Sequence, residues 1–391
     1  MSNAGHTHTE RGTTDSAARS GRSGAVRLVV VGLRFGASFV PIYQRHPDVA
    51  ELAICDLDPE KLAAVGDKHG VTQRFDSLDT VLASDEWDAV HLVTPVPLHV
   101  EQAVAALRAG KHCASAVPAG VSVESLRELV TAQRETGNTY MMMETAVYSR
   151  EFLFVKHLYE QGALGRIQFL RGAHYQDMDG WPSYWAGLPP MHYATHALGP
   201  LLHLTGARAT TVHCVGSGHM RAALHAQYNN PFPIETATFQ LQGPSISGVA
   251  AEVTRSLFET AVTFKESFDI YGDRASFLWQ QVPGDQHALI AFAEPGQQEP
   301  RAAGLPRKAV TVERPEIPYR PDLLPAALAP FAQGGHGGSH PHLVHEFVRS
   351  IVERRPAAID AARAANWTAA GLCAHQSAMR NGEAVTIPLF G

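Results

Sequence analysis

The stretch Val26–Ser38 reads VRLVVVGLRFGAS and joins three kinds of local pattern. Residues 26–31 form an almost continuous run of β-branched and other apolar residues, which is typical of a strand buried on both faces. Gly32 follows at once, and a helical pattern begins after it. We therefore predict a strand, a glycine turn and a helix, the first unit of a parallel α/β domain.

The same alternation continues to Tyr148. Short apolar runs at 50–56, 89–95 and 110–116 are predicted strands. The segments between them carry apolar residues at helical spacing. Strands that alternate with helices predict βαβ units and a doubly wound parallel sheet. We assign residues 26–148 to this domain; its expected helices lie within 38–46, 59–70, 98–110 and 122–137.

The pattern changes at Ser149. After a predicted helix at 151–162, several segments up to residue 280 alternate with a period near two, which indicates a large, mostly antiparallel sheet with one open face. Residues 149–391 are expected to form a second α/β domain for substrate binding and oligomerisation. Residues 283–340 are rich in Pro and Gly, and we expect a loop that covers the site or a plain linker. That stretch contains His336 and His340, and His342 follows it.

Composition sets the broad class. The chain has 391 residues, 45% hydrophobic and 18% charged, with a net charge of −6, as in an ordinary soluble protein of two domains. This charge gives no reason to expect nucleic acid or an anionic membrane as partner. Four scattered cysteines without a CxxC pair favour a reducing, cytoplasmic setting. Residues 1–25 are polar and Gly/Ser/Thr-rich, and we expect a disordered tail.

The glycine turn predicts a dinucleotide site. Gly32 and Gly36 let a backbone approach a pyrophosphate, whereas Arg34 replaces the usual middle glycine and must point away from the phosphates or pair with them. Phe35 belongs to the same turn. Asp56 ends the next strand, where an acid binds ribose hydroxyls and repels a 2′-phosphate. We expect NAD rather than NADP; a domain of this topology without a nucleotide is the alternative.

Further motifs extend along the chain: VTPVPLH (93–99), GKHCASAVP (110–118), GALGRIQFLRG (162–172), YATHALGPLLHLTG (193–206) and FDIYGDRASFLW (268–279). Together they resemble the Gfo/Idh/MocA family of NAD(P)-dependent oxidoreductases over nearly the whole chain from Val26. The resemblance implies a Rossmann domain followed by an α/β domain whose open sheet faces the site and often builds oligomers. A homo-oligomer, dimer or tetramer, is expected.

The resemblance also implies site residues. Thr94, Pro95 and His99 would line the nicotinamide, and Val117 would lie beneath it. The family carries Glu-Lys-Pro where this chain has Ala116-Val117-Pro118, so the lysine that helps to move the hydroxyl proton is missing. The family's Asp-x-x-x-His keeps its histidine here as His196 and loses its acid.

One branch of that family lacks the lysine in a similar way. The NAD-dependent α-N-acetylgalactosaminidases are similar in VPA (117–119), MMMETAVY (141–148) and the Tyr-x-Thr-His of 193–196. Those enzymes oxidise C3, eliminate the C1 substituent, add water and return the hydride, with no net redox change. The missing lysine is therefore compatible with an active enzyme.

His196 is the first candidate for a general base, because modest burial would leave its pKa near neutral. Tyr193 would relay a proton or hold the substrate. Both have structural alternatives, a core histidine and a packing tyrosine. His192, His196 and His203 are spaced suggestively for zinc, but Pro200 argues against one helix through all three. We predict no metal.

Several polar and aromatic residues are candidates for ligand contacts. Glu144 would meet the nicotinamide amide or a substrate hydroxyl, with an interdomain salt bridge or helix cap as the alternative. Aromatic platforms with amide and acid groups suit a sugar. The predicted substrate residues are Tyr148, Gln176, Asp177, Trp181, Trp185 and His192.

These observations predict a cytoplasmic NAD-dependent oxidoreductase that takes hydride from a secondary alcohol of a sugar, cyclitol or glycoside, at C3 by the resemblance. One alternative is a glycosidase or lyase that uses bound NAD without net redox change. The other is a cofactor-sensing regulator that has lost turnover, which the substitutions Arg34 and Val117 would favour.

Overall fold

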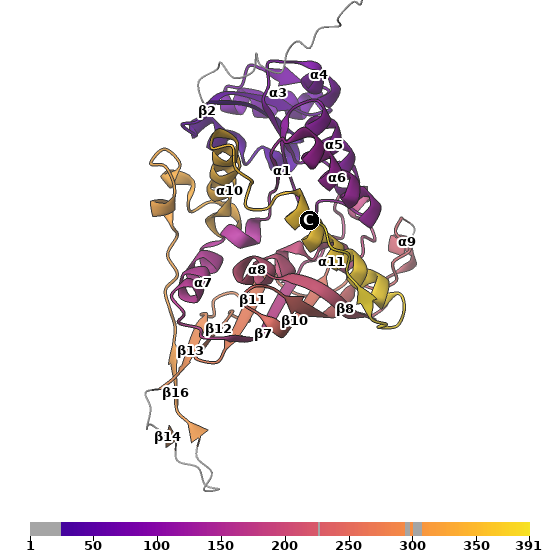
Figure 1. The fold of residues 1–391 in the computed structure, drawn as a ribbon. Helices are drawn as coiled ribbons and strands as arrows, with labels where there is room; N and C mark the ends of the chain where they lie inside the picture. The colour runs from indigo at the N-terminus through magenta and orange to yellow at the C-terminus, as the bar shows by residue number, and fades with distance from the viewer. Residues whose placement is uncertain (1–24, 226, 294–297, 300–306) are drawn as a thin grey trace, which may run out of the picture.

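The structure, a computed structural model, describes residues 25–225, 227–293, 298–299 and 307–391. The expected tail at 1–25 lies outside these residues except for its last position. Two sheets form the frame, one in each half of the molecule (Figure 1).

The first sheet has six parallel strands in the order β3-β2-β1-β4-β5-β6. This is the doubly wound order of dinucleotide-binding folds, and it confirms the predicted topology. The strands are β1 (Val26–Val31), β2 (Val49–Cys55), β3 (Arg74–Phe75), β4 (Ala89–Leu92), β5 (His112–Ser115) and β6 (Tyr140–Met142).

Alternate residues of β1 enter two different cores, as the uninterrupted apolar run requires. Val29 and Val31 pack with α5 and α6, whereas Leu28 and Val30 pack with α2 and α10. The helices of this half are α1 (Leu33–Gly36), α2 (Val40–Arg45), α3 (Pro59–His69), α4 (Leu78–Ala83), α5 (His99–Arg108) and α6 (Val123–Thr136).

The second sheet has nine strands in the order β16-β13-β12-β11-β7-β10-β9-β8-β17. All its pairings are antiparallel except β10 with β7. Its strands are β7 (Ile167–Tyr175), β8 (Arg208–Ser217), β9 (Ile234–Gln242), β10 (Ser247–Ser256), β11 (Lys265–Gly272), β12 (Ala275–Leu278), β13 (Ala288–Phe292), β16 (Val310–Glu313) and β17 (Val385–Thr386). Two further short strands, β14 (Gln298–Glu299) and β15 (Arg307–Lys308), pair with each other.

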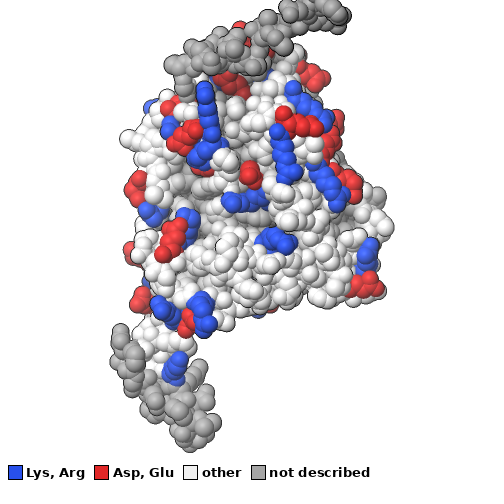
Figure 2. Space-filling model, in the orientation of Figure 1, with Lys and Arg blue, Asp and Glu red and all other residues white. Residues whose placement is uncertain are grey.

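One face of this sheet is covered by α8 (Thr195–Thr205) and α11 (Ala361–Ala378), as Figure 1 shows. Along β9 the residues Ala237, Phe239 and Leu241 are buried on the covered side, while Thr238 and Gln240 are exposed on the other. The period-two pattern therefore correctly predicted which side chains of β9 are buried and which are exposed. Cations and anions are interspersed on the face in Figure 2.

Helix α7 (Arg150–Glu160) leaves the first domain, but the chain later returns to it through α10 (Gly335–Val352). Leu343, Val344 and Phe347 of α10 are buried against the core of β1 and α2. The division at residue 148 therefore does not follow the packing, because α10 completes the nucleotide-binding half (Figure 1).

One local expectation was wrong, and another was correct for a different reason. The GGHGGSHPH segment is not a loop over its whole length. His336, Gly337 and Gly338 form a left-handed bend, and His340 and His342 lie buried in α10. No single helix runs through His192, His196 and His203, as expected, because His192 lies in the 3-10 helix η5 (Pro190–Tyr193). The reason is not Pro200, since α8 continues through this proline and contains both His196 and His203. A helix tolerates this proline because only one hydrogen bond is lost and packing against α11 compensates.

We expect Gly32→Ala to lower the free energy of unfolding by about 3 kcal/mol or more. Gly32 has φ of 89°, and an added Cβ would lie 2.4 Å from the carbonyl oxygen of Val93. Gly70→Ala is the matched control, since Gly70 has φ of 66° with open space around it and should lose only about 1 kcal/mol. Equal losses in denaturant unfolding would contradict the predicted clash with Val93, the residue after β4.

Acid should destabilise the junction of α2 and α10. His46 is buried, its Nε2 lies 3.0 Å from Nδ1 of His345, and burial and that neighbour lower its pKa to about 4. The unfolded chain takes up this proton near pH 6.5, so protonation favours unfolding. The difference corresponds to about 3 kcal/mol lost between pH 6.5 and 4.

The variant His46→Asn, whose side-chain oxygen can still accept the amide hydrogen of Asp48, should flatten this dependence in unfolding curves taken from pH 7 to 4. The control His157→Asn changes an exposed histidine of α7 and should leave the dependence as it is. A wild-type slope retained in His46→Asn would refute the assignment.

Candidate functional site

A row of polar side chains crosses the second sheet where its strands point toward the first domain. The strand register pairs Glu266 of β11 with His174 of β7, and His174 with Arg255 of β10. All three occupy positions that otherwise carry buried apolar residues, such as Phe268 after Glu266 and Val253 before Arg255. On three adjacent strands, polar side chains therefore occupy the face that elsewhere carries buried apolar residues. Such a row indicates a functional site rather than part of the hydrophobic core.

Arg255 anchors this row. It is fully buried and donates hydrogen bonds to the carbonyl oxygens of Tyr193, His174 and Ser256 and to Oε1 of Gln176. Burial lowers the pKa of Arg255 to about 9, so the guanidinium remains charged at neutral pH. Its carbon Cζ lies 5.1 Å from the centre of the Tyr193 ring. A fixed positive charge therefore lies beneath the ring of Tyr193.

Three side chains in contact with one another, Glu144, His196 and Tyr193, connect the first domain to the ring of Tyr193 above Arg255. Glu144 is completely buried, and its Oε1 lies 2.6 Å from Nδ1 of His196; Nε2 of His196 lies 3.0 Å from Oη of Tyr193. Glu144 precedes the short helix η3 (Thr145–Tyr148) and accepts the amide hydrogen of Ala146. The carboxylate is thus held in place before it meets the imidazole.

His196 and His174 have opposite protonation states. Burial alone would lower the pKa of His196, but the carboxylates of Glu144 and Glu266 raise it well above its usual value. The pKa of His174 is held well below that value by burial and by the charges of Arg255 and His196. Their ring centres are 5.1 Å apart. The pair thus supplies one imidazolium and one neutral imidazole at neutral pH.

This result changes the interpretation of His196. Its expected environment, modest burial with a pKa near neutral, is wrong, because two buried carboxylates surround it. Both ring nitrogens are also occupied, so it reaches the cavity chemistry through Tyr193. Neither nitrogen of His174 has a hydrogen-bond partner among the described residues, although both are buried.

Four residues of this network, His174, Tyr193, His196 and Glu266, line a cavity of about 510 Å³ between the two halves of the molecule. Arg34, Phe35, Thr94, His99 and Val117 form its wall on the first domain. Gln176, Trp181, Trp185, Tyr193 and His174 form the wall on the second. The apolar side chain of Val117 therefore lies in the same cavity as the polar and aromatic groups of the second domain.

The residues on the first domain fit a dinucleotide. Asp56 lies at the end of β2, where its Oδ2 accepts the amide hydrogen of Leu33 at 2.7 Å and so fixes the glycine turn. Thr145 Oγ1 and His91 Nε2 are buried in residues that line the cavity, and neither has a hydrogen-bond partner among the described residues. These two atoms and the apolar Val117 suit a carboxamide-bearing ring.

Other expected cofactor contacts lie elsewhere. His99 lines the cavity, but its two nitrogens face the carbonyl oxygens of Thr94 and Pro118 at 2.8 Å and so brace the loop after the cis Val117–Pro118 bond. Pro95 only precedes a 3-10 turn and is not part of the wall. Glu144 contacts His196 and does not line the cavity.

Three expected substrate residues are outside the cavity. Tyr148 stacks on His342 in the packing between the two halves. Asp177 is exposed and accepts the amide hydrogen of Asp179 in a local turn. His192 packs on the ring of His375, which in turn contacts the buried Glu235. In each case the side chain contacts another residue of the folded chain, and the sequence pattern does not predict that contact.

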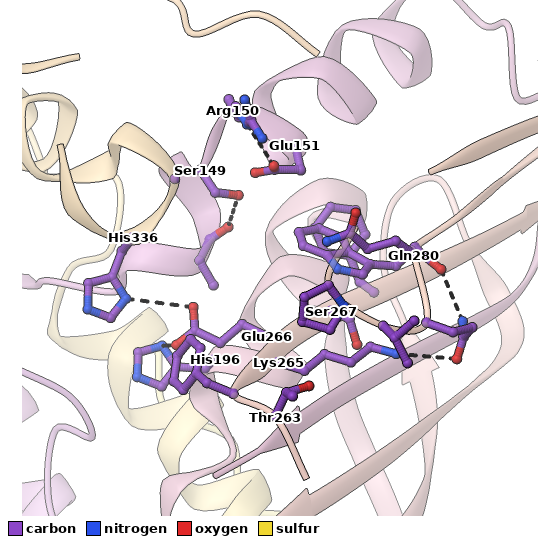
Figure 3. A pocket seen from close by; sticks show the side chains of 18 of the residues that line it. Ser149, Arg150, Glu151, His196, Thr263, Lys265, Glu266, Ser267, Gln280 and His336 are labelled. Carbon is purple, nitrogen blue, oxygen red and sulfur yellow. Dashed lines mark hydrogen bonds and ion pairs between the residues drawn. The ribbon is translucent and has the colours of Figure 1, made fainter. Parts of the chain in front are cut away.

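Conversely, four residues of the site were missed: His174, Arg255, Glu266 and His336. The sequence offers an indication for the first three. Each is a polar residue at a strand position where the alternating pattern predicts a buried apolar residue. His336 had been noted only as part of a loop, and it lies beside Glu266, with Nδ1 3.8 Å from Oε2 (Figure 3).

The ligand atoms of His174, His196 and Glu266 lie within 4.8 Å of one another, a spacing that a metal ion could bridge. However, both nitrogens of His196 already have partners, and its proton balances Glu144 and Glu266. A metal ion would have to displace that proton. The absence of a metal remains a prediction.

Comparisons with known proteins agree with this geometry. Residues 26–144 match the model of an oxidoreductase family with an NAD-binding Rossmann fold, GFO_IDH_MocA. A glycosyl hydrolase family 109 protein of Saccharopolyspora erythraea is 25% identical over 93% of this chain and 83% of its own length. One from Stenotrophomonas maltophilia is 22% identical over 94% of this chain and 90% of its own length.

Among solved structures, levoglucosan dehydrogenase in complex with NADH and levoglucosan has the same fold. It superposes with a TM-score of 0.74 over 93% of this chain and 99% of its own, at 19% identity. No helix among the described residues is long and apolar enough to cross a membrane. Residues 26–144 thus match the NAD-binding Rossmann domain of the GFO_IDH_MocA oxidoreductase family in sequence, and the strand order of the first sheet agrees with that fold.

Proposed function

We propose that this enzyme oxidises a secondary alcohol on the ring of a sugar, cyclitol or glycoside. The observation that carries the proposal is the pair of histidines at the cavity wall, with ring centres 5.1 Å apart, whose surroundings lower the pKa of His174 and raise that of His196. Oxidation of an alcohol needs a group that removes the hydroxyl proton and a charge that stabilises the oxygen it leaves. His174 and His196 supply these two functions.

Val117 and the turn at Gly32 would hold NAD, which would supply the hydride acceptor when bound. His174, as a neutral imidazole, takes the hydroxyl proton. Tyr193 donates its hydroxyl hydrogen to the same oxygen, and the imidazolium of His196 holds Tyr193 through Nε2. Glu144 and Arg255 fix these two groups in place. The products are a ketone, NADH and one proton on the enzyme.

The imidazolium replaces the missing lysine. Val117 occupies the position of the family's lysine and leaves that side of the cavity apolar, with 8% of the residue exposed. The positive charge enters instead from the opposite wall, through His196. This arrangement supports an active enzyme and disfavours the reading of the chain as a regulator.

A carbohydrate fits the second wall. Trp181, Trp185 and Tyr193 present aromatic rings, with ring centres of Trp185 and Tyr193 5.0 Å apart, and Gln176 presents an amide. Sugar C–H faces pack on such rings while hydroxyls bind polar groups. The structural neighbour that binds levoglucosan supports the same class of substrate.

A second candidate function is glycoside cleavage by oxidation, elimination, hydration and reduction. Its support is twofold. The relatives that match more than 90% of this chain are named glycosyl hydrolases of family 109. The cavity also holds more acid–base groups than one alcohol oxidation needs, since Tyr193 can act beside His174 on a neighbouring carbon.

Substitution of the catalytic pair should reduce turnover without loss of the cofactor. We expect His174→Asn and His196→Asn each to lower kcat by about 100-fold or more, since acid–base groups commonly contribute that much. NAD affinity, measured by calorimetry, should stay within about threefold. His192→Asn is the matched control, because His192 faces His375 outside the cavity. Wild-type turnover in both catalytic variants would refute the proposal.

The two candidate functions differ in the fate of the hydride. With aryl glycosides and soluble NAD, a dehydrogenase should produce NADH absorbance in step with substrate consumption. The glycosidase cycle should instead release the phenol with no net NADH. Release of the phenol without any dependence on NAD would exclude both.

A further inference from the structure

A second cavity of about 330 Å³ adjoins the first. The two cavities share four lining residues, and these form the partition between them: His196, Phe264, Glu266 and His336. In Figure 3 the carboxylate of Glu266 points between the imidazoles of His196 and His336. A ligand whose reacting ring lies at His196 can therefore extend past Glu266 into the second cavity.

The wall beyond the partition is not built for the cofactor. It comes from the start of β11, the segment after β12, the start of α7 and Tyr319, and none of its residues belongs to the nucleotide-binding turn. It also lies on the far side of His196 from Val117 and Thr94, which line only the first cavity. This cavity is therefore free for a part of the substrate.

The chemistry of this wall suits a neutral, hydroxyl-rich or aromatic group. The wall beyond the partition combines hydroxyl and amide side chains with aromatic rings. These residues are Ser149, Thr263, Ser267, Trp279, Gln280, Gln281 and Tyr319. Phe264 at the partition is 56% exposed, an apolar surface that needs a cover.

The charges of the cavity balance. Arg150 contacts the carboxylate of Glu151 at 2.8 Å, and Nζ of Lys265 lies 3.3 Å from Oε1 of Gln281. Three cations, Arg150, Lys265 and the imidazolium of His196, oppose three carboxylates. Glu151 and Glu266 lie on the wall, and Glu144 lies behind it with Oε1 2.6 Å from Nδ1 of His196. Such a site has no net charge to attract a phosphate or a second carboxylate, and it favours a neutral ligand.

We propose that the second cavity is a subsite for the group attached to the ring that is oxidised, so that the substrate is a neutral glycoside of at least two rings, with a sugar or an aromatic aglycone. This inference rests on the proposed function, because it takes the reacting ring to be a sugar. It goes further by excluding a free monosaccharide or a lone cyclitol as the preferred substrate. About 300 Å³ is at the lower end for a small-molecule site and is enough for one further ring.

The test is calorimetric and does not depend on turnover. Protein saturated with NAD is titrated with matched sets of a methyl glycoside, a 4-nitrophenyl glycoside and a disaccharide that share one non-reducing sugar, in the gluco and N-acetylgalacto series. We expect the two-ring ligands of at least one series to bind about tenfold or more tightly than the methyl glycoside.

Two variants locate that preference. Thr263→Trp places a large ring in the second cavity from an exposed loop position, and Lys265→Ala removes a polar wall group. In Thr263→Trp the preference should fall to about threefold or less, with methyl glycoside affinity unchanged, and Lys265→Ala should weaken it in part. Lys156→Ala, on the exposed side of α7, is the control and should bind as the wild type. Melting temperatures check that each variant folds.

Equal affinity for the methyl and two-ring glycosides in the wild type would overturn the subsite, as would a preference that survives Thr263→Trp. Either result would leave the proposed oxidation intact if NADH forms with a monosaccharide. Conversely, a preference lost in Thr263→Trp without NADH formation or glycoside cleavage would support the subsite and refute the proposed chemistry. Failure of every sugar to bind would overturn both.

Discussion

The contact between Glu144 and His196, 2.6 Å long and fully buried, is the constraint on which the rest of the site depends. It joins the last turn of the nucleotide-binding half to helix α8 on the second sheet. A buried carboxylate is tolerable only when a cation and hydrogen bonds compensate it, so the imidazole must carry a proton. The protonated imidazole then donates from Nε2 to Oη of Tyr193 and so holds this tyrosine in place. Tyr193 is part of the cavity wall on the second domain.

A second level of organisation comes from the sheet. Register places Glu266, His174 and Arg255 in one row across three strands, and the guanidinium ties this row to Tyr193 through its carbonyl oxygen. The two histidines then acquire opposite protonation states from their surroundings alone. Glu266 lies 3.7 Å from both imidazoles. His196 has Glu144 in addition, whereas His174 is buried beside the guanidinium of Arg255 and the imidazolium. In the proposed mechanism, this network supplies from the other side the positive charge that the family's lysine would supply.

Packing also decides how the two halves cooperate. Helix α10 leaves the second domain and completes the apolar core beneath β1, while its first turn presents His336 to Glu266 and to Phe35 of the glycine turn. The left-handed bend at 336–338 allows the chain to make this reversal. The partition between the two cavities is thus assembled from both halves, which ties the cofactor turn to the substrate wall.

The sequence by itself determined the doubly wound topology, the glycine turn, Asp56 at the end of β2, and the alternating strands, because period and turn chemistry are local properties of the chain. It also singled out His196, Tyr193 and the tryptophans. Only the tertiary structure decided that Glu144 pairs with His196, that Tyr148, Asp177 and His192 face other partners, and that His174, Arg255 and Glu266 meet. Those outcomes depend on strand register and on contacts between residues far apart in the chain, whose electrostatic effects no local pattern contains.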